Sequence, residues 1–274
     1  MGNSAPTLRY ERLRATERMP AMVTRRILAI GGGGFMMEGQ RSAIDQQIVA
    51  LARHSCAGRK PRICLIPTPT GDAESVISEF NDAYGAVAET FQLTPLRKPR
   101  SNSLPMRDIA QSLLTMDAVF VSGGNTKSAL GIWKEWGIDS ALREAYNAGI
   151  LIAGMSAGAF VWFEYGFSDS YYDGFAPLPC LGWIKGGFCP HFNGENQSRA
   201  IALREAVNSG QMPTTIAVDD YAAVLLEDEV VTRVISWRDN CSAYRLSVAH
   251  ECEITADNDK SSSGSRLPLT TGLS

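Results

Sequence analysis

A serine flanked by glycines follows a short apolar run near the middle of this 274-residue chain. Residues 150–153 read Ile-Leu-Ile-Ala, and residues 154–159 read Gly-Met-Ser-Ala-Gly-Ala. This is the sequence pattern of a nucleophile elbow, in which a strand ends, a serine occupies a tight turn and a helix begins behind it. Glycines flank the serine because the turn leaves no room for a Cβ beside the neighbouring backbone. The pattern predicts that Ser156 is a nucleophile at the carboxyl edge of a sheet, as in a serine hydrolase.

A serine hydroxyl needs a base that accepts its proton, and histidine is the usual base. The chain has three histidines. His54 falls at the end of an expected surface helix, where helix capping is its expected role, and His250 lies in a charged stretch near the C-terminus. His191 comes just after the expected strand 184–188 and just before an expected helix. Catalytic side chains often occupy loops at strand ends, so we expect His191 to be the base.

The base needs a carboxylate that orients it, and two positions compete for this role. Asp169 follows the expected elbow helix, whereas Asp219 and Asp220 end the expected strand 215–218. Either position can reach His191 in a folded sheet, and each is also compatible with an ordinary solvated turn. The residues alone therefore leave the choice between Asp169 and Asp220 open.

A tetrahedral oxyanion requires two backbone N–H donors. The residue after the nucleophile normally provides one of them, here Ala157. A neighbouring strand ends in Gly-Gly-Asn-Thr at residues 123–126, and Gly124 or Asn125 is the expected source of the second donor. A phosphate-binding turn is the competing interpretation, but no Walker pattern and no GxGxxG with a ribose-binding acid supports it. Four glycines at 31–34 match a dinucleotide loop only weakly, and we expect their backbone to line the cleft.

Apolar strands alternate with amphipathic helices along the first part of the chain. The expected strands are 26–30, 62–67, 91–93, 117–121 and 150–153, and the expected helices are 42–54, 72–87, 106–114, 127–135 and 139–148. This alternation predicts an α/β fold, a three-layer α/β/α sandwich with a mostly parallel central sheet. Beyond residue 165, closely spaced strands predict a hairpin-rich C-terminal portion, with strands at 184–188, 215–218, 222–226, 230–235 and 243–248 and a last helix at 196–208.

Composition excludes several classes of function. Hydrophobic residues make up 45% of the chain and charged residues 20%, and the net charge of −3 gives no electrostatic reason to expect nucleic acid or a membrane as a partner. No apolar run approaches the roughly 20 residues of a transmembrane helix. Six cysteines without CxxC spacing favour free thiols in a reducing cytoplasm. We expect a flexible leader at residues 1–25, a single hydrolytic domain at 26–256 and a disordered tail at 257–274.

Together these motifs resemble the peptidase E family of serine peptidases, the aspartyl dipeptidase group, whose fold is related to the class I glutamine amidotransferases. The resemblance covers roughly residues 26–250 and is carried by residues 123–126, 154–159 and 190–192, which read GGNT, GMSAGA and PHF. It implies a serine-type exopeptidase or dipeptidase that hydrolyses short peptides through an acyl-enzyme on Ser156, with His191 as the base. It implies no metal and no cofactor.

The resemblance also implies roles for further residues. It places the third catalytic residue at Asp169 or Asp220 and the oxyanion donors at Gly124 and Ala157. Aspartyl-specific members hold the acidic side chain of the substrate with an arginine located after the histidine. Here the alignment puts Asn196 at that position, with Arg199 three residues later, so the side-chain preference is left open.

The same motifs are compatible with functions other than a dipeptidase. Cyanophycinase is a relative that shares the Ser-Ala-Gly elbow but cleaves an Asp-Arg polymer. A glutamine amidotransferase carries cysteine where this chain has Ser156, which argues against that activity. A non-catalytic binding protein on the same fold would lack the base or the oxyanion loop, and this chain has both. The expected partner is a short peptide substrate, and we expect a monomer or homodimer.

Overall fold

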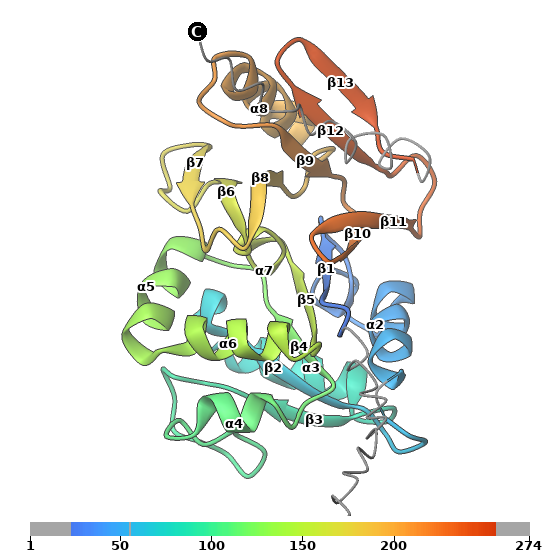
Figure 1. Ribbon diagram of the computed structural model, residues 1–274, viewed down its shortest axis with the longest axis vertical. Helices are drawn as coiled ribbons and strands as arrows, with labels where there is room; N and C mark the ends of the chain where they lie inside the picture. The colour runs from blue at the N-terminus through green and yellow to red at the C-terminus, as the bar shows by residue number, and fades with distance from the viewer. Residues whose placement is uncertain (1–22, 55, 256–274) are drawn as a thin grey trace, which may run out of the picture.

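A computed structural model describes residues 23–54 and 56–255, where the strands form two separate sheets (Figure 1). The predicted tail, and the predicted leader up to residue 22, lie outside the described residues. The first sheet has seven strands, in the order β11 (Val230–Ser236), β10 (Ala222–Glu227), β1 (Arg26–Ile30), β5 (Leu151–Met155), β4 (Ala118–Val121), β2 (Arg62–Ile66) and β3 (Glu89–Gln92). From β1 to β3 the neighbouring strands are parallel, whereas β10 and β11 form an antiparallel hairpin beside β1.

Helices cover both faces of the first sheet. One face packs against α1 (Phe35–Glu38), α2 (Ala43–Arg53) and α3 (Glu74–Tyr84), and the other packs against α4 (Ile109–Leu113), α5 (Thr126–Trp136) and α6 (Ile138–Asn147). Side chains of β1 alternate between these two cores, because successive residues of a strand point to opposite faces. The predicted α/β class with a three-layer arrangement around a mostly parallel sheet is confirmed.

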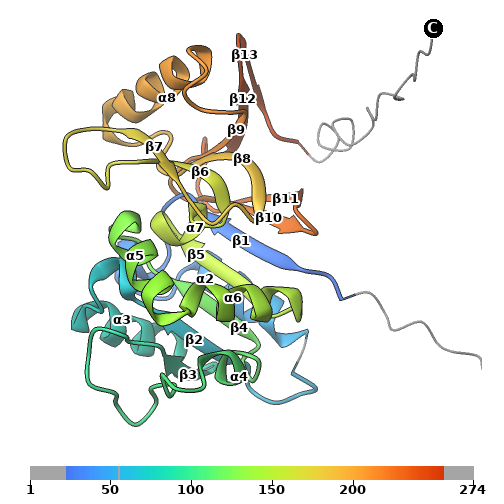
Figure 2. The same ribbon diagram turned by 60° about the vertical axis from the view of Figure 1, so that its left-hand side comes forward.

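The second sheet has six strands, in the order β13 (His250–Glu253), β12 (Ala243–Ser247), β9 (Thr215–Val218), β8 (Ile184–Cys189), β6 (Phe163–Ser168) and β7 (Ala176–Pro179). Strands β6, β8 and β9 are parallel neighbours, and the outer strands are antiparallel. Its outer face packs against α8 (Ser198–Asn208), which lies at the end of the molecule away from the first sheet (Figures 1 and 2). Strands β6, β7 and β13, and the grouping of the late strands into a second sheet, were not predicted from the sequence.

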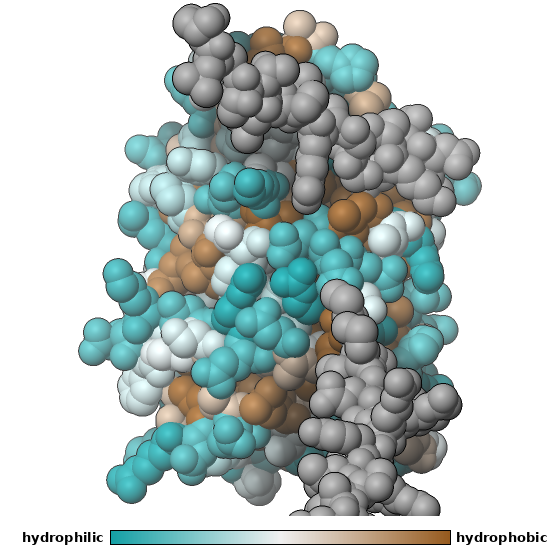
Figure 3. Space-filling view, in the orientation of Figure 1, coloured by the Kyte–Doolittle hydropathy of each residue, from teal (hydrophilic) through white to brown (hydrophobic). Residues whose placement is uncertain are grey.

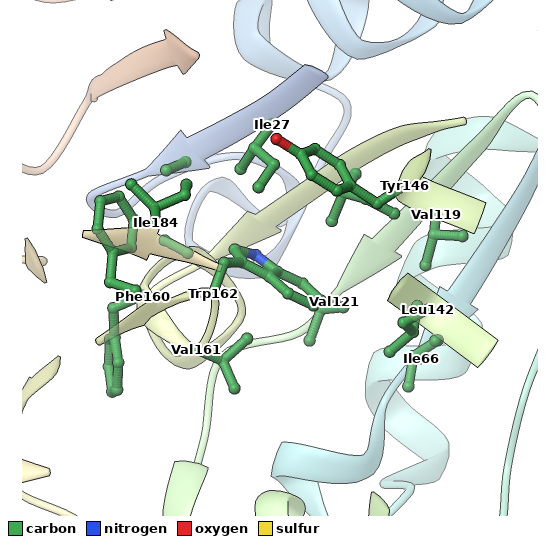
Figure 4. Packing of buried hydrophobic residues seen from close by; sticks show 14 of the residues in the cluster. Ile27, Ile66, Val119, Val121, Leu142, Tyr146, Phe160, Val161, Trp162 and Ile184 are labelled. Atoms are coloured by element: carbon green, nitrogen blue, oxygen red, sulfur yellow. The ribbon is translucent and has the colours of Figure 1, made fainter. Parts of the chain in front are cut away.

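The two sheets share one hydrophobic core. Buried residues of β6, β8 and β9 belong to the same cluster as residues of β1, β4 and β5, and Figure 4 shows part of this cluster around Trp162. Trp162 is fully buried, and its indole Nε1 donates a 2.8 Å hydrogen bond to the carbonyl oxygen of Gly158. The sheets are therefore packed against each other directly behind the elbow, which fixes the segment that carries Ser156.

The surface facing the viewer in Figure 3 is mostly hydrophilic, with hydrophobic side chains scattered in small patches. Among the described residues, no helix is both long enough and apolar enough to cross a membrane. All six cysteines fall within the described residues, and none of them forms a disulfide bond.

Three chain crossovers connect the two sheets. The chain passes from β5 to β6 through α7 (Ala157–Phe160), from β9 to β10 through Asp219–Tyr221, and from β11 to β12. Helix α7 is one turn long, and β6 begins at Phe163, soon after α7 ends at Phe160. The predicted candidates Ser156 and Asp220 lie in two of these crossovers, at the junction of the sheets.

Candidate active site

Ser156 lies between the last residue of β5 and the first residue of α7. Its backbone has φ 55° and ψ −112°, a conformation that non-glycine residues adopt rarely and at a cost of about 1–3 kcal/mol. The Ser156 N–H donates a 3.1 Å hydrogen bond to the carbonyl oxygen of Ile30 at the end of β1. Ser156 thus occupies a strained turn that is held by the neighbouring strand β1.

The two elbow glycines are needed because backbone segments approach each other closely. A Cβ on Gly154 would collide with the backbone of Gly158, and a Cβ on Gly158 would collide with the carbonyl group of Val121 in β4. Any side chain at either position would push α7 off the sheet. The pattern of small residues around Ser156 therefore follows from packing of the turn against β4 and β5.

His191 and Asp220 form a direct pair across two loops of the junction. Their contact is a 2.5 Å hydrogen bond between His191 Nδ1 and Asp220 Oδ1, and about a fifth of each side chain is exposed. A second bond holds the loops together, because the Asp220 N–H donates to Asn193 Oδ1 at 2.8 Å. With the proton on Nδ1 facing the carboxylate, Nε2 is the ring nitrogen free to accept a proton.

Asp219, the neighbour of Asp220, has a structural environment. It is almost fully buried, and its Oδ2 accepts a 3.0 Å hydrogen bond from the Ser242 N–H. Burial raises the pKa of Asp219, and the nearby Asp220 carboxylate raises it further. Asp219 ties the β9–β10 crossover to the segment before β12, whereas Asp220 faces the cleft.

The glycine run after β1 packs against the His191–Asp220 pair. A Cβ on Gly32 would lie 2.7 Å from His191 Nδ1 and 2.9 Å from His191 Cε1, and closer still to Asp220 Oδ1. The Gly32 carbonyl oxygen accepts a 2.7 Å hydrogen bond from the Tyr221 N–H. None of the four glycines is in the lining of the cleft, so the expectation that their backbone lines it is wrong, and Gly32 instead packs behind the His191–Asp220 pair.

Gly124 follows β4 and faces Ser156 across the cleft. It has φ 125°, and a Cβ there would collide with the carbonyl of Pro69 in the turn around η1 (Thr68–Thr70), so only glycine fits. A Cβ on its neighbour Gly123 would lie 3.4 Å from the Ser156 Cβ, which brings this loop against the serine. Ala157 opens α7, and the first N–H groups of a helix have no partner within the helix.

Asn125 has its donors engaged elsewhere. Its N–H donates to the Pro69 carbonyl oxygen at 2.8 Å, and its side-chain Nδ2 donates to the Ser170 carbonyl oxygen at 3.0 Å. Its Oδ1 caps α5 by accepting from the Ser128 N–H at 2.9 Å. The Asn125 N–H is engaged by Pro69 and Asn125 fixes the loop, so Gly124 remains the candidate donor of the two predicted in this loop.

Asp169 pairs with Arg199. Arg199 Nη2 lies 3.4 Å from Asp169 Oδ2, and the Arg199 guanidinium stacks on the Phe175 ring at 4.3 Å from its centroid. The Arg199 side chain is 4% exposed, whereas that of Asp169 is 61% exposed. Of the two acids proposed for His191, the structure pairs His191 with Asp220 and places Asp169 beside Arg199.

A cleft of about 540 Å³ unites most of the predicted residues. Its lining contains Ser156, His191 and Asp220 together with Gly124, Asn125, Asp169, Tyr172, Gly194 and Arg199. Ala157, which follows the serine, is buried behind it. Among the described residues, no cluster of three or more His, Cys, Asp or Glu side chains is arranged to hold a metal ion.

Asn196, the predicted recognition residue, is not in the lining of this cleft. It lies in η2 (Glu195–Gln197), is exposed and has φ 52°. Arg199, one turn later, is in the lining of the cleft. His54 contacts the carbonyl oxygens of Ala50 and Leu51 at the end of α2, as expected for a helix cap, and His250 is exposed on β13.

Comparison with known proteins shows the family of this chain. The model of peptidase family S51 matches residues 27–234, and the uncharacterized peptidase YgaJ of Bacillus subtilis (strain 168) is 37% identical over 228 residues, covering 83% of this chain and 94% of the relative. The chain belongs to peptidase family S51. It is therefore a serine peptidase, and the predicted membership of the peptidase E group is confirmed.

Solved structures of low sequence identity share the S51 fold. A peptidase from an acI-B1 Actinobacterium has a TM-score of 0.63 at 16% identity, over 85% of this chain and 98% of the other. A putative peptidase E protein from Listeria monocytogenes EGD-e has a TM-score of 0.52 at 17% identity, over 82% of this chain and 100% of the other. These similarities show that the chain shares its overall fold with both proteins.

Three residues of this S51 site were missed at the level of sequence. Tyr172 and Gly194 line the cleft, and Ser170 holds Asn125 and the Thr126 N–H, the latter through its Oγ at 3.1 Å. Asp173 and Gly174 follow Tyr171 and Tyr172, and this pattern is typical of an exposed turn that carries aromatic side chains. Ser170 carried no local signal of this role, because Asn125 and Thr126 lie more than 40 residues away from it in sequence.

Proposed function

We propose that this S51 peptidase is a serine-type dipeptidase or exopeptidase that hydrolyses short peptides through an acyl-enzyme on Ser156. The observation that carries the proposal is the 2.5 Å hydrogen bond between His191 Nδ1 and Asp220 Oδ1 in a cleft that Ser156 also lines. A histidine oriented by a carboxylate beside a strained serine is the arrangement that activates a hydroxyl for attack.

In the first half of the reaction, His191 Nε2 accepts the proton of the Ser156 hydroxyl as its Oγ attacks the peptide carbonyl carbon. Asp220 keeps the imidazole in the required tautomer and stabilises the imidazolium that forms. The oxyanion accepts hydrogen bonds from the N–H groups of Gly124 and Ala157. The tetrahedral intermediate collapses as His191 returns the proton to the leaving amine, which departs with its electron pair and leaves an ester on Ser156.

In the second half, water enters where the amine left. His191 accepts a proton from the water as its oxygen attacks the ester carbonyl carbon, and the same two N–H groups stabilise the second oxyanion. Collapse of this intermediate releases the carboxylic acid, and His191 returns the proton to Ser156 Oγ. The enzyme is restored without any group beyond its own residues and one water molecule.

Charges in the cleft support a small peptide with free termini or charged side chains. Arg199 offers a buried cation for a carboxylate, and the exposed oxygen atoms of Asp169 offer an anion for an ammonium group. A volume of about 540 Å³ lies in the range of small-ligand sites, which extends over about 300–1,000 Å³. We therefore infer that the substrate is a short peptide, handled without a nucleic acid or membrane partner.

We infer a cytoplasmic location because none of the six cysteines forms a disulfide bond and thiols stay reduced in that compartment. This inference is tested by fractionating cells that express the protein and probing each fraction with an antibody. Recovery of the protein in the extracellular or membrane fraction would contradict it.

The function is tested by labelling the protein with a fluorophosphonate and identifying the modified residue by mass spectrometry. Ser156→Ala is expected to abolish both labelling and turnover, whereas Ser78→Ala, which changes an exposed serine of α3, is the matched control. Turnover is measured on a dipeptide panel that compares Asp-Xaa with neutral Xaa-Xaa and includes an Asp-Arg polymer for a cyanophycinase-like activity. Labelling at another residue, or no labelling of the folded wild-type protein, would contradict the proposal.

A further inference from the structure

The segment between β6 and β7, residues 169–175, presents an aromatic side chain to the cleft. We call it the Tyr172 loop. Its first part is fixed to the oxyanion loop, because the Ser170 carbonyl oxygen accepts from Asn125 Nδ2 at 3.0 Å and Ser170 Oγ accepts from the Thr126 N–H at 3.1 Å. Ser170 is 6% exposed, so these bonds are shielded from water.

The other end of the Tyr172 loop is equally well fixed. The Phe175 ring lies beneath the Arg199 guanidinium and stacks with Phe167 of β6 at a centroid distance of 5.9 Å. Between the two anchors, the ring of Tyr171 covers the Lys127 ammonium group at 4.8 Å. The loop therefore holds its tip in a defined place beside the cleft.

Tyr172 at this tip is different from its neighbours. Its side chain lines the cleft that contains Ser156, yet the residue is 85% exposed, against 39% for Tyr171. Its backbone has φ 66°, which is uncommon for a bulky residue, and its N–H closes the turn on the Asp169 carbonyl oxygen at 2.8 Å. The fold thus holds a large ring in solvent, in a disfavoured backbone conformation, at the edge of the catalytic cleft.

An exposed aromatic ring in a preformed cleft gains contact area when a ligand covers it. We propose that Tyr172 is a specificity-determining residue, whose ring packs on an aromatic or large apolar side chain beside the scissile bond of a short peptide. The inference rests on the proposed peptidase function and deepens it. Arg199 and Asp169 also line the cleft and are suited to charged groups of the peptide. The Tyr172 ring is therefore left to contact an uncharged side chain of the substrate.

This assignment is distinct from the chemistry at Ser156. A ring that only packs on a side chain of the substrate stabilises the bound peptide and the transition state alike, so its loss raises KM and leaves kcat nearly unchanged. Stacking on an aromatic partner predicts a weakening of roughly 10-fold for aromatic peptides when the ring is removed. Peptides that contain only alanine have no side chain for the ring to cover, and their binding stays the same.

Binding is measured by calorimetry in the Ser156→Ala protein, with Ala-Ala, Ala-Phe and Phe-Ala and the same series carrying Asp in place of Ala. In that background Tyr172→Ala is expected to weaken binding of the phenylalanine peptides by roughly 10-fold, without effect on the alanine peptides. Tyr172→Phe keeps the ring and is expected to bind as the parent does. Trp136→Ala, at an exposed ring at the end of α5 and outside the cleft lining, is the matched control and leaves the ratio of the two affinities unchanged.

Equal losses for alanine and phenylalanine peptides, no loss in Tyr172→Ala, or no binding of any peptide would overturn the proposal. Melting temperatures of the variants check that the loop change leaves the fold intact. Because binding is measured without the nucleophile, a Tyr172-dependent affinity together with an inactive wild-type protein would count against the proposed hydrolysis alone. Hydrolysis that is equally selective with and without the Tyr172 ring would count against the specificity role alone.

Discussion

Gly32→Ala is expected to inactivate the enzyme although residue 32 has no side chain that takes part in the reaction. The added methyl group would lie 2.7 Å from His191 Nδ1 and still closer to Asp220 Oδ1. No left-handed backbone conformation is required at Gly32, so the whole effect of the substitution comes from space. The substitution therefore changes the position of the His191–Asp220 pair without removing either side chain.

The size of the effect follows from the distances. An ordinary contact begins at 3.4 Å, so the imidazole must retreat by about 0.7 Å, and the carboxylate, which lies closer to the new atom, must move further. Their 2.5 Å hydrogen bond cannot survive these displacements. Misplacing a catalytic group by about 1 Å costs on the order of 10²-fold in rate, and losing the orienting carboxylate costs up to about 10⁴-fold. We expect activity to fall by about 10²- to 10⁴-fold, or about 2.7–5.4 kcal/mol in the activation barrier.

The assay is the second-order rate constant for fluorophosphonate labelling of Ser156, which requires no knowledge of the peptide substrate. The Nδ1 proton of His191, followed by NMR at low field, reports the hydrogen bond directly and should disappear in Gly32→Ala. Gly131→Ala is the matched control, because a Cβ at this position in α5 meets no atom within 4 Å. Circular dichroism and thermal unfolding verify that both variants fold.

One result would refute this reasoning. If folded Gly32→Ala retained the wild-type labelling rate together with the low-field proton, the glycine loop would not set the position of the pair. Loss of the low-field proton at an unchanged rate would show instead that Asp220 does not assist Ser156, and the role proposed for Asp220 would fall.

Three further predictions address the acid, the oxyanion loop and a buried carboxyl group. Asp220→Asn should slow labelling by up to about 10⁴-fold, whereas Asp169→Asn should slow it less than 10-fold. The reverse order of these two effects would show that Asp169, and not Asp220, assists His191. Ser170→Ala removes the acceptor of a buried N–H, so urea unfolding should show a loss of about 1–3 kcal/mol; an unchanged midpoint would contradict it. Burial raises the pKa of Asp72, so the folded state binds that proton more tightly than the unfolded state. The stabilising contribution of the Asp72 carboxyl group is present below its ordinary pKa of 3.8 and is lost as pH rises through its folded-state pKa. The Asp72→Asn protein should therefore become more stable relative to the wild type as pH rises. Stability profiles of the two proteins that run parallel with pH would contradict this.

Elements with a strong local pattern were predictable from the sequence. The apolar strands β1, β2 and β5 and the amphipathic helices α2, α3 and α6 follow the expected ranges within a few residues. The tight turn at Ser156 was predictable too, because the glycines that permit it lie within two residues of Ser156. In each case the cause of the structure lies in neighbouring residues, so the sequence contains the signal.

The second sheet depended on pairings that no local pattern encodes. Strand β6 pairs with β7 and β8, and a bulge between Phe163 and Tyr165 breaks the regular alternation that would have indicated a strand. Strand β7 contains Pro177 and Pro179, which normally argue against a strand and are tolerated here because β7 is an edge strand. A helix was expected after Ser156, but α7 ends after one turn at Phe160 and the chain continues as β6 from Phe163.

The choice between the two acids shows why topology decides this site. Asp169 lies 13 positions after Ser156 and Asp220 lies 64 after it, yet it is Asp220 that meets His191. Asp220 reaches the site because the chain crosses there from the second sheet back to the first, beside the crossover that carries Ser156. Asp169 follows β6 on the other side of the cleft, where Arg199 engages it. A junction built from two crossovers thus separates the His191–Asp220 pair from the Asp169–Arg199 pair, and Gly32, in the loop after β1, packs against the His191–Asp220 pair.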